Sequence, residues 1–331
     1  MMRAVVVEKF GPIDSHGVGE LPSPSLRANE VLVSIKACAV NFVDLLVING
    51  KYQFLPDRPF APGKLPVGVV TKTGPGVHQI SMGERVLTLA EHGGYAEEIA
   101  VPVSQCFRLP NSMSFTDAAA ITLSYDTAWF ALRERGRLQA GESVLVLGAS
   151  GAVGRASIQI AKSMGARVFA GLSNPKKLEL IRDYSVEGVI DLSQPDLHNS
   201  LREQVYAQNN GIGVDLVIDP VGGDAFDAAL RALAWCGRIV IVGFVSGRIP
   251  LIKANYLLLK NIEASGLQIS DYRKKKPELM AKCINDIFQL YDDGKLKVPA
   301  TTTYKLDQFK TAMHEIENRT VPNRLVLLPN G

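Results

Sequence analysis

The chain has 331 residues, of which 47% are hydrophobic and 21% are charged. That length predicts about two domains with sizeable cores, and that composition excludes a mainly disordered or fibrous chain. Its 36 basic and 33 acidic residues leave a formal net charge of +3, which is too small to mark a binding surface for nucleic acid.

The N-terminal apolar run, Val5–Val7, is too short for the hydrophobic region of a signal peptide and is typical of a first strand. No stretch approaches the roughly 20 apolar residues of a membrane span. The four cysteines form no Cys-x-x-Cys pair, so neither a zinc ribbon nor a disulfide framework is predicted. We therefore expect a cytoplasmic protein with reduced cysteines and no membrane partner.

Short β-rich runs punctuated by Gly and Pro fill the first hundred or so residues, which predicts an all-β, barrel-like unit. The runs are Ala4–Val7, the alternation Val31, Val33 and Ile35, then Val67–Thr71, Arg85–Leu89 and Tyr95–Val101.

From Ser143 onward strands alternate regularly with helices, which predicts βαβ units and a doubly wound, parallel, six-stranded sheet. The strands are Ser143–Leu147, Arg167–Ala170, Gly188–Asp191, Asp215–Asp219, Arg238–Val242 and Ile262–Gly266. The helices between them are Ala152–Met164, Pro175–Asp183, Leu197–Tyr206 and Asp224–Ala234. The fold class is therefore α/β, with a β-rich first domain.

After Gly266 the pattern predicts helices around Glu278–Tyr291 and Leu306–Asn318 and a final strand, Arg324–Leu328. We expect this tail to return to the first domain. The predicted domains are residues 1–121, residues 122–266 and a C-terminal part, 267–331, packed so that a cleft lies between the two folds.

A Gly-rich turn follows the first of the parallel strands and opens a helix, which is the context that a dinucleotide-binding fingerprint requires. Gly151 would let the backbone approach a pyrophosphate, Gly154 would let the helix pack close to the strand, and the helix N-terminus supplies free N–H groups. Ala149 departs from the first glycine of the pattern. The expected contacts are Ala149, Ser150, Gly151, Ala152 and Val153. The alternative is a tight turn that binds no ligand.

The tip of the second strand carries no acidic residue to hold a ribose 2′-hydroxyl. It has Gly171, Ser173 and Lys177, with Lys176 beside them, where a carboxylate would repel a 2′-phosphate. The sequence therefore predicts NADPH as cofactor. In the alternative interpretation the lysines only cover a solvated helix face.

Motifs spread over nearly the whole chain resemble the medium-chain dehydrogenase/reductase superfamily, and within it the zinc-free quinone oxidoreductase branch that includes zeta-crystallin. They are Val40-Asn41-Phe42-Val43-Asp44, Gly50-Lys51-Tyr52, Pro62-Gly63, Gly83-Glu84-Arg85-Val86, Gly94-Tyr95-Ala96-Glu97, Thr127-Ala128-Trp129, Ala149–Gly154, Asp219-Pro220-Val221-Gly222-Gly223, Gly237-Arg238 and Gly243-Phe244. The resemblance implies a GroES-like catalytic domain built from both chain ends, an inserted Rossmann domain, NADPH as hydride donor, and a homodimer or homotetramer.

Both residues that ligate catalytic zinc in related dehydrogenases are replaced. Asn41 stands where they have Cys, and Lys64 stands where they have the His of a Gly-His-Glu. The group of closely spaced cysteines that holds structural zinc is also missing, since Cys106 is alone in its region. We expect no metal site, and this removes the Lewis acid that polarises carbonyls in those relatives.

Four residues are expected to be catalytic by this resemblance or by their position in it. Tyr52 would donate to a developing oxyanion, Asn41 would hold the nicotinamide ribose or the substrate, and Asp44 would orient that loop. Lys64, at the vacated ligand position, would stabilise an enolate; the alternative is a lysine that points to water.

Five further residues are expected to contact the cofactor. Thr127, Gly243, Phe244 and Val245 would flank the nicotinamide, although Phe244 is equally typical of core packing. A Gly-Lys of the relatives is Asn323-Arg324 here, so Arg324 keeps a positive charge near the cofactor. Leu192 replaces the tyrosine that many relatives have beside the 2′-phosphate, which weakens the expected preference for NADPH over NADH.

The predicted function is a metal-free, NADPH-dependent reduction of a quinone or an α,β-unsaturated carbonyl, with a small molecule as the partner. One alternative is an enoyl-thioester reductase, which uses the same scaffold. A second is a non-enzymatic protein that binds NADPH and RNA. The basic run from Arg273 to Lys276 is interpreted as a solvated helix start, with a phosphate or RNA contact as the alternative.

Overall fold

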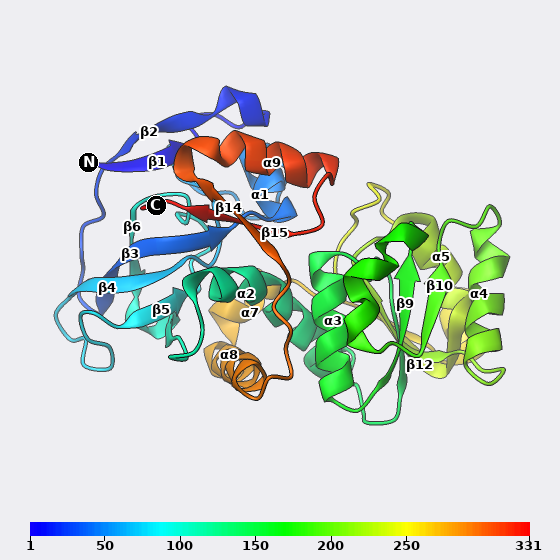
Figure 1. Cartoon of the computed structure of the whole chain (residues 1–331). Coiled ribbons are helices and arrows are strands. Elements are labelled where there is room, and N and C mark those ends of the chain that lie inside the picture. Colours follow the sequence, from blue (N-terminus) through cyan, green and yellow to red (C-terminus); the bar gives the residue numbers. More distant parts are fainter. The chain divides into compact units, whose positions relative to one another are not determined.

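The computed structural model describes residues 1–331, which divide into two compact units (Figure 1). The first, called the β-rich unit, comprises Met1–Leu123 together with Val298–Gly331. The second, called the βαβ unit, comprises Ser124–Lys297. No helix in either unit is both long enough and apolar enough to cross a membrane.

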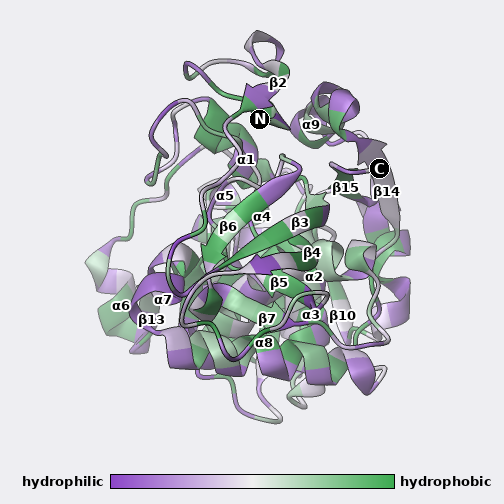
Figure 2. Ribbon diagram, turned by 90° about the vertical axis from the view of Figure 1, so that its left-hand side faces the viewer, coloured by the Kyte–Doolittle hydropathy of each residue, from purple (hydrophilic) through white to green (hydrophobic).

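The β-rich unit contains a seven-stranded sheet with the order β14-β15-β3-β4-β5-β7, in which β6 also pairs with β3, and a separate β1-β2 ribbon. Its strands are β1 (Met2–Val6), β2 (Gly17–Leu21), β3 (Glu30–Ala39), β4 (Val67–Thr73), β5 (Arg85–Thr88), β6 (Glu98–Pro102), β7 (Cys106–Arg108), β14 (Thr301–Lys305) and β15 (Arg324–Leu328). The alternating residues of β3, Val31, Val33 and Ile35, are fully buried, and much of this strand is hydrophobic in Figure 2. This confirms the predicted β-rich fold.

Both chain ends build this unit, because the C-terminal strand β15 pairs with β3. Helices α1 (Phe42–Ile48) and α9 (Phe309–Asn318) bury Leu45 and Phe309 in one core with Leu327 of β15. Helix α2 (Phe115–Trp129) begins in the β-rich unit and ends in the βαβ unit. Three short 3₁₀ helices complete the unit: η1 (Ile13–Ser15), η2 (Val103–Gln105) and η5 (Leu306–Gln308).

The βαβ unit contains a six-stranded sheet with the order β10-β9-β8-β11-β12-β13, all of whose pairs are parallel. Its strands are β8 (Ser143–Val146), β9 (Arg167–Leu172), β10 (Gly188–Asp191), β11 (Val214–Asp219), β12 (Leu233–Ile241) and β13 (Glu263–Gly266). In the order of their appearance along the chain this is 3-2-1-4-5-6, the order of dinucleotide-binding sheets. The predicted six-stranded, doubly wound sheet is confirmed.

Helices connect these strands, and all but the last of them, α6, lie where the sequence predicts a helix. They are α3 (Ala152–Ser163), the 3₁₀ helix η4 (Pro175–Tyr184), α4 (Leu197–Gln208), α5 (Gly223–Ala232) and α6 (Ala254–Lys260). The sheet core is aliphatic and aromatic, with Leu145, Phe169 and Phe226 all buried in one cluster.

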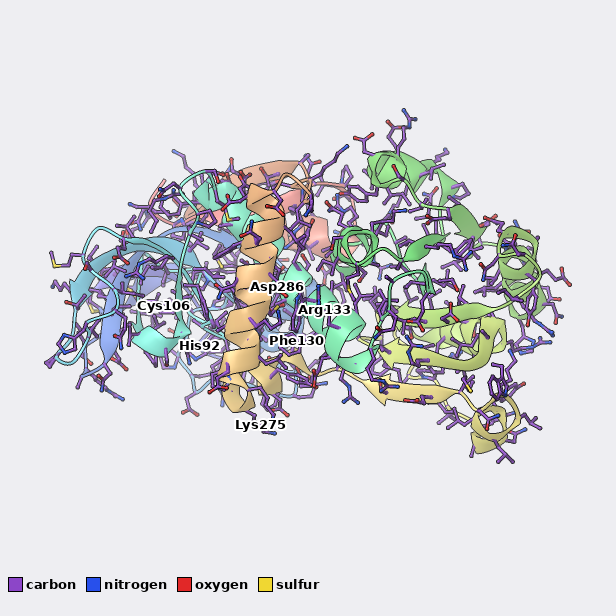
Figure 3. All side chains as sticks on the ribbon, turned by 90° about the horizontal axis from the view of Figure 1, so that it is seen from below. His92, Cys106, Phe130, Arg133, Lys275 and Asp286 are labelled. Atoms are coloured by element: carbon purple, nitrogen blue, oxygen red, sulfur yellow. The ribbon has the colours of Figure 1, made fainter.

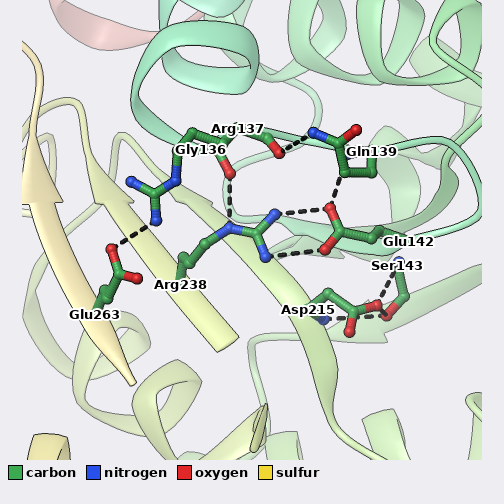
Figure 4. A network of polar contacts seen from close by, with 8 residues as sticks. All are labelled: Gly136, Arg137, Gln139, Glu142, Ser143, Asp215, Arg238 and Glu263. Atoms are coloured by element: carbon green, nitrogen blue, oxygen red, sulfur yellow. Dashed lines mark hydrogen bonds and ion pairs between the residues drawn. The ribbon is translucent and has the colours of Figure 1, made fainter. Parts of the chain in front are cut away.

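A polar network links the amino ends of β8 and β11 to Arg238 in the middle of β12 (Figure 4). The Arg238 guanidinium makes two hydrogen bonds to the Glu142 carboxylate, of 2.9 and 2.7 Å, and donates to the Gly136 carbonyl. Beside it, Asp215 accepts from both the backbone N–H and the hydroxyl of Ser143 at 2.7 Å. These bonds set the relative register of three strands whose opposite ends carry the residues expected to bind a cofactor.

Two more helices, α7 (Ile269–Lys275) and α8 (Pro277–Asp292), follow the last strand of this sheet. The compact units group them with the βαβ unit, and the chain returns to the β-rich unit at Val298. The predicted returning part begins earlier, at residue 267, directly after β13. The π-helical segment η3 (Phe130–Arg135) extends α2 and lies beside α8 (Figure 3). The indole N–H of Trp129 donates to Asp286 of α8 at 3.0 Å.

Candidate active site

The Gly-rich turn between β8 and α3 is held by backbone hydrogen bonds. The N–H of Gly151 donates to the Gly148 carbonyl at 2.9 Å, and the N–H of Ala149 donates to the Gly171 carbonyl at the end of β9 at 3.0 Å. Gly148 has a φ of +61°, a conformation that L side chains rarely adopt. The turn therefore leads directly from the carboxyl end of one strand into the N-terminus of α3.

A second glycine lets α3 approach this turn closely. A Cβ added to Gly154 would lie 2.3 Å from the Gly148 carbonyl oxygen and 2.7 Å from Cα of Ala149, so only glycine fits. Gly151 is the exposed N-cap of α3. The first N–H groups of a helix have no partner within that helix, and together with the helix dipole they attract an anionic group. The turn thus has the form of a pyrophosphate cradle.

The tip of β9 carries the residues predicted to recognise a 2′-phosphate. Gly171 is buried within the strand, whereas Ser173 is exposed and Lys177 is partly exposed in the first turn of η4. The side chain of Asn174 caps η4 by accepting from the N–H of Lys176 at 3.0 Å. No carboxylate lies on residues 171–178, so the tip is positively charged.

The loop after β12 carries Gly243, Phe244 and Val245. Phe244 and Val245 are 39% and 38% exposed, so Phe244 is not the core residue of the alternative interpretation. The N–H of Val245 donates to the Pro220 carbonyl at 3.2 Å. This bond holds the loop beside the carboxyl end of β11.

Asp219, the last residue of β11, is fully buried at this point and was given no role by the sequence analysis. Its Oδ1 accepts from the N–H groups of Val221 and Gly222 at 2.8 and 2.9 Å, while its Oδ2 has no hydrogen-bond partner. Burial raises the pKa of this carboxyl to about 6, although the two N–H groups oppose the shift. Asp219 therefore holds the loop that follows β11, one of the two strands beside the switch point where dinucleotides bind in such sheets.

Thr127 lies on α2 in the βαβ unit and is 8% exposed. Its hydroxyl donates to Oδ1 of Asp126 at 3.2 Å. The Asp126 carboxylate in turn forms a buried ion pair with Arg273 of α7, at 2.5 Å. Arg273 is thus a buried partner of Asp126, so the expectation of a fully solvated basic run is wrong at its first residue.

In the β-rich unit, Asn41 and Asp44 belong to one buried network at the start of α1. Oδ2 of Asp44 accepts from the N–H of Asn41 and from the hydroxyl of Tyr95, both at 2.9 Å. Oδ1 of Asn41 accepts from Nη2 of Arg324 at 2.7 Å, and Nδ2 of Asn41 donates to the Ala39 carbonyl at 3.1 Å. Both ends of the Asn41 amide are therefore held in a fixed orientation.

Burial dominates the electrostatics of this network. Removal from water raises the pKa of Asp44 to about 6, against the opposing effects of its hydrogen bonds and of Lys64. Arg324 is 5% exposed and also donates to the Ala120 carbonyl at 3.2 Å. The arginine that we expected among the cofactor contacts therefore lies, in the structure, in hydrogen-bond contact with a predicted catalytic residue.

Lys64 and Tyr52 form the second group of predicted catalytic residues. The Lys64 side chain is 3% exposed, and its ammonium lies 5.0 Å from the centre of the Tyr52 ring. Nζ donates to Oε2 of Glu91 at 2.5 Å. Lys64 therefore does not point to water, and its partner Glu91 is a residue that the sequence analysis did not single out.

The structure thus gathers the predicted residues into local groups within each unit. In the β-rich unit Asn41 and Asp44 join Arg324 and Tyr95. Glu91 lies 27 residues from its partner and belongs to no motif of the sequence, so it was missed. Tyr95 belongs to the motif Gly94-Tyr95-Ala96-Glu97, but its bond to Asp44 spans 51 residues and was not predicted. No three His, Cys, Asp or Glu side chains lie close enough together to hold a metal ion.

Comparison with known proteins assigns both units to families. Residues 27–111 match the family described as alcohol dehydrogenase GroES-like domain, and residues 152–285 match the family described as zinc-binding dehydrogenase. The chain is 36% identical to the quinone oxidoreductase-like protein 2 homolog of Nematostella vectensis, over 92% of this chain and 82% of that protein.

Solved structures agree in fold over the full length. A quinone oxidoreductase of Pseudomonas syringae superposes with a TM-score of 0.91 at 26% identity, covering 99% of this chain and 100% of that one. The quinone oxidoreductase of Escherichia coli, determined in complex with NADPH, superposes with a TM-score of 0.89 at 27% identity over the same shares. The chain therefore belongs to the quinone oxidoreductase branch of the medium-chain dehydrogenase/reductase superfamily, a family of oxidoreductases.

Proposed function

We propose that this protein is an NADPH-dependent oxidoreductase that reduces a quinone or an α,β-unsaturated carbonyl without a metal ion. The observation that carries the proposal is the turn between β8 and α3 together with the tip of β9. There a Cβ at Gly154 would collide with the Gly148 carbonyl, and Lys177 stands in a segment, residues 171–178, that contains no carboxylate. These residues fit a dinucleotide that carries an additional phosphate.

The cofactor would be held by residues of the βαβ unit. The N–H groups of Ala149–Val153 would bind the pyrophosphate, Ser173 and Lys177 would bind the 2′-phosphate, and Gly171 would leave room for the adenosine ribose. Thr127 and the loop Gly243–Val245 would flank the nicotinamide. When bound, the reduced nicotinamide supplies a hydride.

The residues of the β-rich unit would act on the acceptor. The hydroxyl of Tyr52 would donate to the oxygen on which negative charge develops, and the ammonium of Lys64 would add a positive charge near that oxygen. Asn41 would hold the ribose or the substrate with an amide already oriented by Arg324. Asp44 would position Asn41 by accepting from its backbone N–H.

The remaining assignments are proposals of the same kind. We expect Arg324 to keep positive charge near the cofactor through its bond to Asn41. We also expect a homodimer or homotetramer in the cytoplasm. The unpaired edge of β13 and the exposed leucines Leu258 and Leu259, 77% and 73% accessible on the preceding helix, offer an apolar edge for such an assembly.

The experiment is NADPH oxidation by the purified, chelator-treated protein with an ortho-quinone, a para-quinone, an enal and an enoyl-CoA, each also with NADH. We expect turnover of the quinones or the enal with NADPH preferred. Much faster turnover of the thioester would support the enoyl-thioester reductase instead. NADPH binding without turnover of any acceptor would contradict an enzymatic role.

A further inference from the structure

The ion pair between Lys64 and Glu91 is an unusual feature of the β-rich unit. The Lys64 side chain is 3% exposed and the Glu91 side chain 20%, with Nζ and Oε2 at 2.5 Å. Burying an ammonium is costly unless a partner compensates its charge. Most other ion pairs of the chain are far more exposed, such as Arg108 with Glu84, whose side chains are 59% and 28% exposed.

Aromatic rings and titratable groups surround this pair. The Lys64 ammonium lies over the Tyr52 ring, 5.0 Å from its centre, and the Tyr52 and Phe54 rings lie in an edge-to-face arrangement with their centres 6.3 Å apart. Two other titratable groups sense the charge of Lys64. It opposes the burial that raises the pKa of Asp44, and it adds to the desolvation that lowers the pKa of His92.

Only one end of the pair is accessible to solvent. Lys64 is buried, while Glu91 is partly exposed and is followed by the exposed His92. A proton lost by the Lys64 ammonium can therefore be replaced through the Glu91 carboxylate, which reaches water. The same carboxylate holds the ammonium in place beside Tyr52.

We propose that Lys64 and Glu91 are a proton-delivery pair for the reduction, with Lys64 as the acid and Glu91 as the residue that positions and reloads it. The inference rests on the proposed function. Hydride transfer to the β-carbon of an enone forms a C–H bond and moves the π electrons to the oxygen, giving an enolate. An N–H bond of Lys64 then breaks as its proton passes to the enolate, and water returns a proton to Nζ through Glu91. The balance is one enone, one NADPH and one proton in, and one saturated carbonyl and NADP⁺ out.

The pair distinguishes classes of acceptor. An enal or enone gives a strongly basic enolate, which needs an acid in the site. An electron-poor quinone gives a weakly basic hydroquinone anion, which can leave the site without a proton from an acid. The pair therefore makes enals and enones the acceptors for which this site is adapted.

The test compares Lys64→Met, Glu91→Gln and Glu91→Asp with wild type, using an enal and tetrachloro-para-benzoquinone. General acid catalysis contributes about 10²–10⁴-fold, so we expect kcat with the enal to fall about 100-fold in Lys64→Met and about tenfold in Glu91→Gln. Glu91→Asp should restore part of the loss. With the chloroquinone the loss in Lys64→Met should be at least tenfold smaller than with the enal, because the charge near the oxygen is lost but the anion needs little protonation. The two Glu91 variants should stay within about twofold of wild type with the chloroquinone.

A matched control removes a glutamate from a different ion pair of the same unit. Glu84→Gln loses the bond to Arg108 and should leave both activities unchanged. The pH profile of kcat with the enal supplies a second comparison. In Glu91→Gln its alkaline limb should lie at a lower pH than in wild type, whereas Glu84→Gln should keep the wild-type profile. A structural role for Glu91 would not produce that shift.

A binding measurement tests the proposal even where a variant has too little activity for kinetics. para-Nitrophenol, bound in the presence of NADP⁺, should show its phenolate absorbance with wild type and Glu84→Gln and its phenol absorbance with Lys64→Met. Equal losses for enal and chloroquinone, or phenolate bound equally by Lys64→Met, would overturn the proposal. A wild-type protein that reduces the quinone but no enal overturns it too and leaves the proposed function intact, whereas a wild type inactive with every acceptor refutes both.

Discussion

Replacing Asp44 by Asn tests the electrostatics of the buried network directly. Burial raises the pKa of Asp44 from 3.8 to about 6, and one pKa unit corresponds to about 1.4 kcal/mol. Ionising Asp44 in the folded protein therefore costs about 3 kcal/mol more than in the unfolded chain. Because the folded state keeps its proton to a higher pH, this group makes the protein less stable as the pH rises from about 4 to about 6.

The Asp44→Asn variant would lack this dependence because the new amide does not ionise. Both hydrogen bonds to Asp44, from the N–H of Asn41 and the hydroxyl of Tyr95, end on the same oxygen, Oδ2. An amide oxygen in that place can accept both. Any constant difference in packing affects the variant equally at all pH values and cancels in the comparison.

The assay is urea unfolding of wild type and Asp44→Asn at pH 4 and pH 7, followed by far-UV circular dichroism. We use dichroism because both tryptophans, Trp129 and Trp235, lie in the βαβ unit. The free energy of unfolding of the variant, relative to wild type, should rise by about 2.4 kcal/mol between the two pH values, because part of the full effect lies below pH 4. A difference that stays constant would refute the account of Asp44 as a buried carboxyl ionised at a cost.

The other predictions concern the βαβ unit. Lys177→Ala should raise KM for NADPH about tenfold, since a charge-assisted bond is worth about 1.5–3 kcal/mol, and should leave KM for NADH unchanged; an equal effect on both cofactors would exclude a 2′-phosphate contact. Gly154→Ala should abolish NADPH binding, measured by fluorescence titration, because of its contact with the turn, whereas Gly266→Ala, which has open space around it, should bind normally. Asp126→Asn should lower the free energy of unfolding by about 3–5 kcal/mol in chemical denaturation, because it leaves Arg273 buried without its charge partner; a loss below about 1 kcal/mol would show that the pair is not buried in solution.

The fold could be predicted largely from the sequence because its signals are periodic and local. Alternating Val31, Val33 and Ile35 indicated a half-buried strand, and the regular succession of short apolar runs from Ser143 indicated parallel strands joined by helices. The return of the chain ends to one unit came from the resemblance, and the pairing of β15 with β3 agrees with it.

The sequence indicates candidate site residues only where the expected contact depends on a position in a turn or at a strand end. The predictions for Gly154 and Lys177 are of that kind. Glu91 does not, because its role depends on a loop that brings it to Lys64 across 27 residues. Arg273 stands in a run of four basic residues that indicated a solvated face, and only the packing of α7 shows that it turns inward to Asp126.

Direct hydride transfer is the central claim, and isotopic labelling tests it most directly. The protein, treated with chelator, is given an enal and NADPH deuterated at C4 in either the R or the S position, and the product is analysed by mass spectrometry and NMR. We predict deuterium on the β-carbon of the product from one of the two labelled cofactors and not from the other. A product that carries no deuterium from either cofactor, or activity that returns only when zinc is added, would contradict the account.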